Sequence, residues 1–482
     1  MITQRDLVQR LARRNLGAWS VVERVQDLAI ADELRALQRR DRRTRLALIV
    51  HQDVPRGRGS ARLDVDAFDG SADDLVDQAL SLALAAVGPA WSSAPPAAPA
   101  KVNLVDQDLV KRELDAVARN TLARLRRPAN VTVTASAEIL REKVTVIASS
   151  GFHASWLATT LRADALLSTS TSAATGSGTA NGSGTAGGNG AANATRIASG
   201  NGTTHGSSNA NNTGTAAATG TPAAAGNGAR SLMISREARR ADDLNLDAAL
   251  ADAAADLLHL ADAGSPSPGP CALWLGPEAL VHGDDYGVWT VFAHQADSAV
   301  ERQGLTRYRW RSEITPGAAQ LAEPLSITSN GALDFATRST PITDDAIAIR
   351  HFPIIQRGIA VGLGLSAREA ALRNTDPNGG VRNLVVAPGI WPGTPSPTTR
   401  TIEVRRLHAL SIDPYTGDAT LDIALGLEHR PDRPEPVPFT GGTVRLDLVA
   451  ALARARRSSQ LLRRGAYHGP ASVLIDDAEL LT

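Results

Sequence analysis

The stretch GSARLDVDAF, residues 59–68, carries the pattern that decides the fold class. Apolar Leu63 and Val65 alternate with charged Arg62 and Asp64. Because successive side chains of a strand point to opposite faces, this alternation is typical of a strand with one buried and one polar face. The stretch therefore predicts a sheet with one face packed against other elements.

The next segment, SADDLVDQALSLALAAVG at 71–88, predicts the helix that covers such a face. Ser71 and Asp74 have the spacing of a capping box, in which each satisfies a backbone N–H group of the first turn. Apolar residues follow at helical spacing: Leu75, Ala79, Leu82 and Ala86. A strand followed by a covering helix is typical of an α+β layer.

Strand alternation and helical spacing predict the remaining elements in the same way. Helices are expected at 2–16, 106–127, 246–263 and 446–463. Strands are expected at 19–30, 45–53, 131–167, 230–244, 271–280, 346–366, 382–389, 400–413, 419–430 and 471–477. The fold class is therefore α+β, with an N-terminal antiparallel sheet and helices, then a larger strand-rich C-terminal domain.

The composition divides the chain further. A Pro- and Ala-rich linker occupies 91–102, and a run of Ser, Thr, Gly, Ala and Asn begins at 168, with almost nothing to bury. We expect an N-terminal α+β part at 1–100, a helix and strand meander at 101–167, a flexible low-complexity insertion at 168–228, and the C-terminal strand-rich domain at 229–482.

Bulk properties exclude some classes of function. The 50 basic and 50 acidic side chains of the 482 residues leave a formal net charge of zero, so no nucleic acid and no anionic membrane is expected as a partner. Cys271 is the one cysteine, which excludes an intrachain disulfide. The N-terminus has no apolar run of signal-peptide length, so the expected location is the cytoplasm.

Five runs together resemble the TldD/PmbA family, the paired subunits of a cytoplasmic zinc peptidase. In chain order they are RGRGSARLDVDAFDGSADDLVDQAL in the N-terminal layer, TDDAIAIRHFPIIQRGIAVGLGLSAREAALRN (343–374), NLVVAPG (383–389), SIDPYTGDATLDI (411–423) and PVPFTGGTVRLDLVAAL (436–452). Each turn motif is common by itself, so the order of the runs carries the resemblance. The resemblance implies the TldD/PmbA-like fold.

The TldD-like branch of that family carries His-Glu-x-x-x-His on a helix, where two histidines bind zinc and the glutamate serves as general base. In this sequence the motif falls on 289–294, with Trp289 at the first ligand and Thr290 at the base, and only His294 is retained. The family's cysteine ligand falls near Val404, and Cys271 is expected in the core. The resemblance therefore implies the TldE/PmbA-like branch, which lacks the zinc motif.

Trp289, Thr290 and His294 are accordingly candidates for lining a substrate cavity, with no catalytic and no metal-binding residue expected in this chain. His294 as a structural histidine, or as part of a metal set with distant histidines, remains open. Asp284, Asp285 and Asp297 are either a carboxylate cluster or solvated residues at a helix start. Tyr308 and Trp310 are either pocket or core aromatic residues.

The expected function is a non-catalytic subunit of a heterodimeric zinc-dependent peptidase or amide hydrolase. It would complete the substrate cavity of a TldD-like partner, which would hold the zinc, and the substrate would be a peptide or N-acyl amide. Peptide degradation and natural-product (antibiotic) maturation both remain open. The alternatives are an independent hydrolase with an unrecognised metal site, or a non-enzymatic binding or scaffold homodimer.

Overall fold

The structure is a computed structural model that describes residues 2–14, 16–33, 37–65, 70–93, 95, 97–125, 131–169, 230–283, 286–395 and 398–482. The insertion expected at 168–228 lies outside the described residues from position 170 onward, as do Asp284 and Asp285. Within the described ranges, none of the helices combines the length and the apolar character that crossing a lipid bilayer requires.

The N-terminal half is built on one seven-stranded antiparallel sheet in the order β4-β3-β2-β1-β5-β6-β7. Its strands are β1 (Ala18–Asp32), β2 (Leu37–Val54), β3 (Gly57–Val65), β4 (Val87–Gly88), β5 (Thr132–Ala148), β6 (His153–Thr169) and β7 (Arg230–Ala238). Strands on both sides of the 91–102 linker belong to this sheet. The expected N-terminal antiparallel sheet is confirmed.

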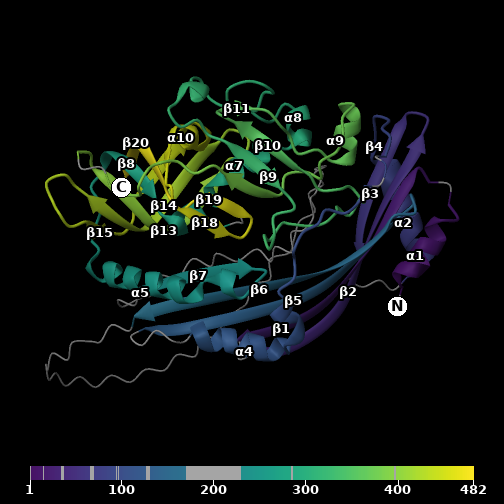
Figure 1. Cartoon of the computed structure of the whole chain (residues 1–482), viewed down its shortest axis with the longest axis horizontal. Coiled ribbons are helices and arrows are strands. Elements are labelled where there is room, and N and C mark those ends of the chain that lie inside the picture. Colours follow the sequence, from purple (N-terminus) through teal and green to yellow (C-terminus); the bar gives the residue numbers. More distant parts are fainter. Residues whose placement is uncertain are drawn as a thin grey trace, which may run out of the picture.

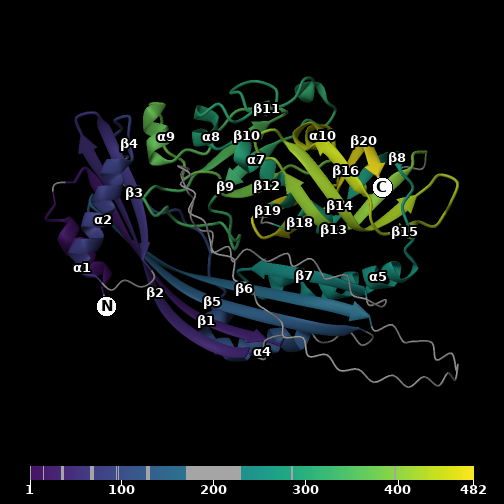
Figure 2. The same ribbon diagram turned by 180° about the vertical axis from the view of Figure 1, so that it is seen from behind.

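Helices cover the convex side of this sheet at both of its ends (Figures 1 and 2). They are α1 (Gln4–Leu11), α2 (Ala72–Ala85), α3 (Gln107–Lys111) and α4 (Leu114–Leu125), while α5 (Leu246–Asp262) follows β7. Ser71 and Asp74 form the expected capping box of α2. The helix expected at 106–127 is divided, because the backbone at Arg112 is extended.

The alternation in β3 separates two environments, as the sequence predicted. Leu63 and Val65 pack in the core that α1 and α2 share with the sheet. Arg62 points to the opposite face, where it lines a cavity. The polar face of this strand therefore faces the rest of the molecule instead of bulk solvent.

The C-terminal half contains two further sheets. A six-stranded sheet has the order β11-β10-β9-β12-β19-β18, and in the other sheet β13, β8, β20, β16 and β14 pair into a closed ring to which β15 and β17 are attached. The strands are β8 (Gly269–Leu275), β9 (Ile327–Asn330), β10 (His351–Gln356), β11 (Ile359–Ala360), β12 (Asn383–Val386), β13 (Thr401–Ile412), β14 (Asp418–His429), β15 (Val437–Phe439), β16 (Thr443–Asp447), β17 (Arg456–Arg457), β18 (Leu461–Arg464), β19 (Tyr467–Pro470) and β20 (Val473–Leu481).

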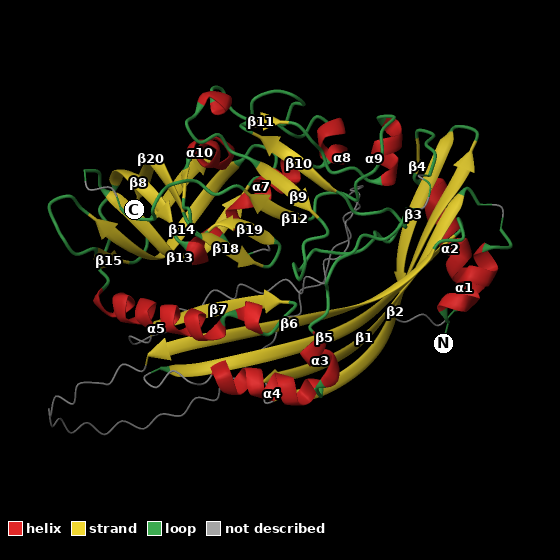
Figure 3. Ribbon diagram, in the orientation of Figure 1, coloured by secondary structure: helices red, strands yellow, loops and turns green. Residues whose placement is uncertain are grey.

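Short helices connect these strands: α6 (Pro277–Leu280), α7 (Thr290–Gln295), α8 (Ser298–Arg302), α9 (Ala367–Leu372) and α10 (Leu448–Arg454). Three 3-10 turns, η1 (Asp242–Leu244), η2 (Gly287–Trp289) and η3 (Ala318–Gln320), complete the described helical elements. Strands dominate this half (Figure 3), so the α+β class with a strand-rich C-terminal domain is confirmed.

The helix expected at 446–463 is wrong beyond Arg454. Ala455 is extended, and the next residues form β17 and β18. Arg457 is buried, and its guanidinium donates to the backbone carbonyls of Ala387 and Glu323. These buried bonds require the chain to leave the helix.

The N-terminal sheet curves along one side of the C-terminal half (Figures 1 and 2). Its β3–β4 end reaches the neighbourhood of α9, where Gly88 of β4 lies against the side chain of Arg368. The face of the sheet opposite α1 and α2 thus becomes one wall of the space between the two halves.

Candidate functional site

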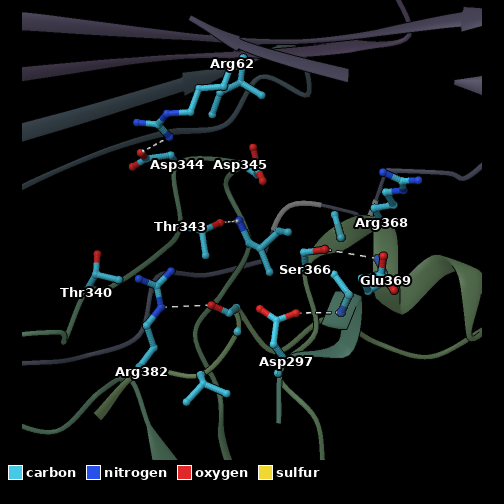
Figure 4. A pocket seen from close by; sticks show the side chains of 18 of the residues that line it. Arg62, Asp297, Thr340, Thr343, Asp344, Asp345, Ser366, Arg368, Glu369 and Arg382 are labelled. Atoms are coloured by element: carbon cyan, nitrogen blue, oxygen red, sulfur yellow. Dashed lines mark hydrogen bonds and ion pairs between the residues drawn. The ribbon is translucent and has the colours of Figure 1, made fainter. Parts of the chain in front are cut away.

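A cavity of about 850 Å³ lies between the N-terminal sheet and the C-terminal half. That volume is within the range of small-molecule sites in proteins. Strands β1, β2, β3, β5 and β6 supply one wall, and the segments 286–303, 338–347, 364–369 and 379–382 supply the other. Charged side chains from both halves meet inside it (Figure 4).

Asp344 joins the two walls. Its carboxylate accepts hydrogen bonds from Arg24 of β1 at 2.7 Å and from Arg62 of β3 at 2.8 Å. Its backbone carbonyl also accepts from the Ser20 hydroxyl at 2.8 Å. Burial alone would raise the pKa of Asp344, but the two guanidinium groups outweigh it and lower the pKa. Asp344 is therefore a charged structural link.

Asp345, the next residue, has the opposite electrostatic environment. The side chain of Asp345 lines the cavity and is exposed within it. No described residue forms a hydrogen bond with its carboxyl group. Burial, and then repulsion from Asp344, raise the pKa of Asp345 to about 6. A carboxyl group that titrates near neutral pH can accept or donate a proton, which is common at functional sites.

Two arginines on the C-terminal wall lie on different sides of Asp345 (Figure 4). The Nε of Arg382 donates to the carbonyl of Gly379 at 3.1 Å, and burial lowers the pKa of Arg382. The Nε of Arg368 is buried, with no hydrogen-bond partner in the part of the chain that is described. By contrast, Arg302 pairs with buried Glu369 at 3.1 Å.

The β2–β3 wall presents a histidine–serine pair. Nδ1 of His51 lies 2.9 Å from the hydroxyl of Ser60, directly across the two strands. The ring of Trp91 packs edge-on against His51 at 4.9 Å between centroids. Burial, and then the charge of Arg58, lower the pKa of His51 to about 4. At neutral pH this wall therefore offers a hydroxyl and an uncharged imidazole.

Structural comparison places this architecture among known ones. The full chain matches a proposed modulator of DNA gyrase from Bacteroides thetaiotaomicron (13% identity, TM-score 0.70, 100% of this chain and 99% of the other) and a second such modulator from Thermotoga maritima (14%, 0.70, 99% and 100%). It also matches TldE from Thermococcus kodakarensis (12%, 0.69, 100% of both chains). The chain has the TldD/PmbA-like fold. Neither a family model nor a curated protein sequence matches it.

The residues that the sequence resemblance assigns to the zinc motif separate into two environments. Thr290 and His294 of α7 line the cavity. Trp289 is fully buried in the C-terminal core, where its ring stacks on Tyr467 at 6.0 Å. Asp297 lines the cavity as well, and its carboxylate caps α8 by accepting from the N–H groups of Ala299 and Val300.

A glycine sets the position of this segment. Gly287 has a φ of 54°, and a Cβ atom there would lie 2.1 Å from the carbonyl oxygen of Leu280. Only glycine tolerates both the left-handed conformation and this close approach. The 3-10 turn before α7 can therefore pack directly against α6, which directs Thr290 and His294 toward the cavity.

The other residues singled out in the sequence lie elsewhere. Cys271 and Val404 are buried in the C-terminal core, as expected for Cys271, and burial raises the pKa of the Cys271 thiol. Tyr308 is buried and donates to the carbonyls of Ile354 and Gly362, whereas Trp310 is 56% exposed. Among the described residues, no group of three or more His, Cys, Asp or Glu side chains is placed to hold a metal ion.

Sequence reasoning did not identify the acidic pair, Arg368 or Arg382 as site residues. The Asp344–Asp345 pair stood at the start of a run that resembles the family, and Arg62 stood on the polar face of its strand. Asp344 is 282 positions from Arg62 and 320 positions from Arg24 in the chain, so no local sequence pattern could connect these side chains.

Proposed function

We propose that this chain is the non-catalytic, TldE/PmbA-like subunit of a heterodimeric zinc-dependent peptidase or amide hydrolase, and that it completes the substrate cavity of a TldD-like partner. The observation that carries the proposal is which side chains α7 and the turn before it present to the cavity. This helix faces the cavity with Thr290 and His294, while Trp289, which the sequence resemblance aligns with the first zinc ligand, packs in the core. The full-length likeness to TldE supports it.

Trp289 at the end of η2 and Thr290 at the start of α7 do not fit a zinc site. An indole ring buried against Tyr467 and a threonine hydroxyl are not the imidazole and carboxylate groups that the zinc subunit uses. Zinc and the hydrolytic chemistry are therefore assigned to the partner. This chain would enclose and orient the substrate, which raises its effective concentration and limits access of water.

The proposed substrate is a peptide or an N-acyl amide, in peptide degradation or in the maturation of a natural product such as an antibiotic. The charged cavity favours a polar ligand of this kind over an apolar one, because Arg382 and Asp345 offer a donor and an acceptor that an apolar ligand would leave unsatisfied. A cytoplasmic location stays a prediction from the N-terminal sequence.

The experiment compares zinc content and amide hydrolysis in three preparations: this chain alone, a TldD-like protein with His-Glu-x-x-x-His alone, and the two co-expressed. We expect about one zinc per heterodimer, as in a single catalytic site, and hydrolysis only in the co-expressed sample. A partner in which the motif glutamate is replaced by glutamine is the control. Stoichiometric zinc or hydrolysis in this chain alone would overturn the proposal.

A further inference from the structure

Arg382 is a partly buried cation without an acidic partner among the described residues. Of its side-chain nitrogens, Nε donates to the carbonyl of Gly379, and no carboxylate of the described residues forms an ion pair with the guanidinium. The backbone around it is firmly held, because its N–H donates to the Ser329 hydroxyl at 2.9 Å and its carbonyl accepts from the Tyr286 hydroxyl. The side chain thus projects into the cavity from a fixed base.

Three other arginines of the same cavity are paired with carboxylates. Arg24 and Arg62 share Asp344, and Arg302 pairs with Glu369. Removing a charge from water is costly unless an opposite charge or several hydrogen bonds compensate it. Arg382 therefore lacks a compensating anion among the described residues, and its side chain lines a cavity that a ligand can enter.

Asp345 supplies the complementary feature. Its carboxyl group faces the same cavity as Arg382, without a hydrogen-bond donor among the described side chains and backbone groups. A ligand that suits both residues carries an anionic oxygen group for the guanidinium and an N–H group for the carboxylate. Acylated amino acids and peptides with a free carboxylate have these two groups side by side.

We propose that the cavity binds a peptide or N-acyl amino acid that has a free carboxylate, and that Arg382 anchors this carboxylate. The inference rests on the proposed function for its substrate class and adds the requirement for the free acid. A guanidinium binds a carboxylate through two parallel hydrogen bonds, which fixes orientation as well as position. The anchored end would determine which amide of the ligand is presented to the partner's side of the cavity.

The test measures binding of two matched probes to the full chain by titration calorimetry at pH 7.5. The probes are N-acetyl-L-alanyl-L-alanine and its C-terminal amide, which differ in the charge at one end only. A charge-assisted pair in an enclosed site leads us to expect that the acid binds at least about tenfold more tightly than the amide. Equal affinities, or no binding of the acid, would overturn the proposal.

Variants locate the anchor. Arg382→Gln should abolish the preference for the acid, and Arg382→Lys, which keeps the charge, should retain part of it. Arg368→Gln changes the charge of the same cavity on the other side of Asp345, and Arg350→Gln changes an exposed arginine outside it. Arg350→Gln should leave the preference within about twofold of wild type, since screening weakens distant charges, and Arg368→Gln should reduce the preference less than Arg382→Gln does. An equal loss in Arg368→Gln would overturn Arg382 as the anchor.

The binding test is independent of the proposed heterodimer. If the acid preference is found but no TldD-like partner produces hydrolysis, the binding inference stands and the proposed function fails. If the complex hydrolyses amides but binds acid and amide probes equally, the proposed function stands and the anchor fails. Melting temperatures of the variants establish that each is folded before its affinity is compared.

Discussion

Asp344 and Asp345 are adjacent in the chain, yet their environments move their pKa values in opposite directions. Asp344 is held charged by Arg24 and Arg62, and its charge then disfavours a second one on Asp345. Asp344 therefore stays an anion, whereas Asp345 can gain or lose a proton near neutral pH.

Replacing Asp345 by asparagine should change the pH dependence of stability. The pKa of Asp345 is raised in the folded protein from 3.8 to about 6, so its stabilising contribution is complete below 3.8 and is lost as pH rises through 6. Asp345→Asn should therefore melt above wild type at pH 7.5, with a smaller difference at pH 4.5. Thermal melting at both pH values checks this, with exposed Asp376→Asn as control. Equal differences at the two pH values would contradict it.

Glu278 is the most strongly paired acid of the C-terminal half. Its carboxylate contacts Arg236 at 2.6 Å, Arg406 at 3.0 Å and Arg464 at 2.5 Å, joining β7, β13 and β18. Burial opposes ionisation, but the three guanidinium groups outweigh it and lower the pKa of Glu278 to about 2. The contribution of this group to stability is present above pH 4.5 and is lost as pH falls through 2.

Glu278→Gln should destabilise the protein by about 3 kcal/mol at pH 7, because three largely buried guanidinium groups lose their shared anion. The control is Asp77→Asn, which breaks an exposed pair with Arg14 and should cost less than about 1 kcal/mol. Urea denaturation of the two variants measures the difference. A loss no larger than that of the control would show that Glu278 adds no net stability.

At the scale of elements, α2 depends on its N-terminal cap. Ser71 accepts from the N–H group of Asp74 while Asp74 accepts from that of Ser71. We expect Ser71→Ala to weaken the helix by about 1 kcal/mol. Faster hydrogen–deuterium exchange of residues 72–85 would report this. Ser81→Ala, on the exposed side of the same helix, should leave exchange unchanged, and equal acceleration in both variants would refute the role of the cap.

Elements of this kind were predictable because their signals are local. The alternation in β3 and the capping box of α2 are contained in a few consecutive residues, and the structure confirms both. The end of α10 was not predictable, because residues 455–464 contain no glycine or proline that would mark the end of a helix. What ends the helix is the buried position of Arg457, whose carbonyl partners come from the distant residues Glu323 and Ala387.

The difference between local and distant signals also explains which site residues could be predicted from the sequence. Thr290 and His294 were found through a motif of six residues, and both line the cavity. The motif could not show that Trp289 belongs to the core, because its partner Tyr467 is in the last strands of the chain. Arg382 lies in none of the quoted runs, the run that contains Asp345 did not indicate a site, and only the cavity brings the two residues together.

At the scale of the whole molecule, Asp344 is one of the links between the two halves, beside Glu278 and Arg239. Arg24 and Arg62 come from the N-terminal sheet, and the loop at 343–347 belongs to the C-terminal half. The three side chains are between 16% and 21% exposed, so the pairs are only weakly screened. The cavity wall on one side is therefore positioned by charges that cross between the halves.

Asp344→Asn should loosen the halves from one another. Arg24 and Arg62 would lose the anion they share, although each keeps one other carboxylate partner, so the expected cost is on the order of 2 kcal/mol. Because the pKa of Asp344 is lowered, its contribution is present above 3.8 and is lost as pH falls through that lowered pKa, so the variant should approach wild type in acid. Hydrogen–deuterium exchange at pH 7 should rise together in β1, β3 and 343–347, while α10 stays protected. Exchange that rises only in the loop would mean that other contacts hold the halves together.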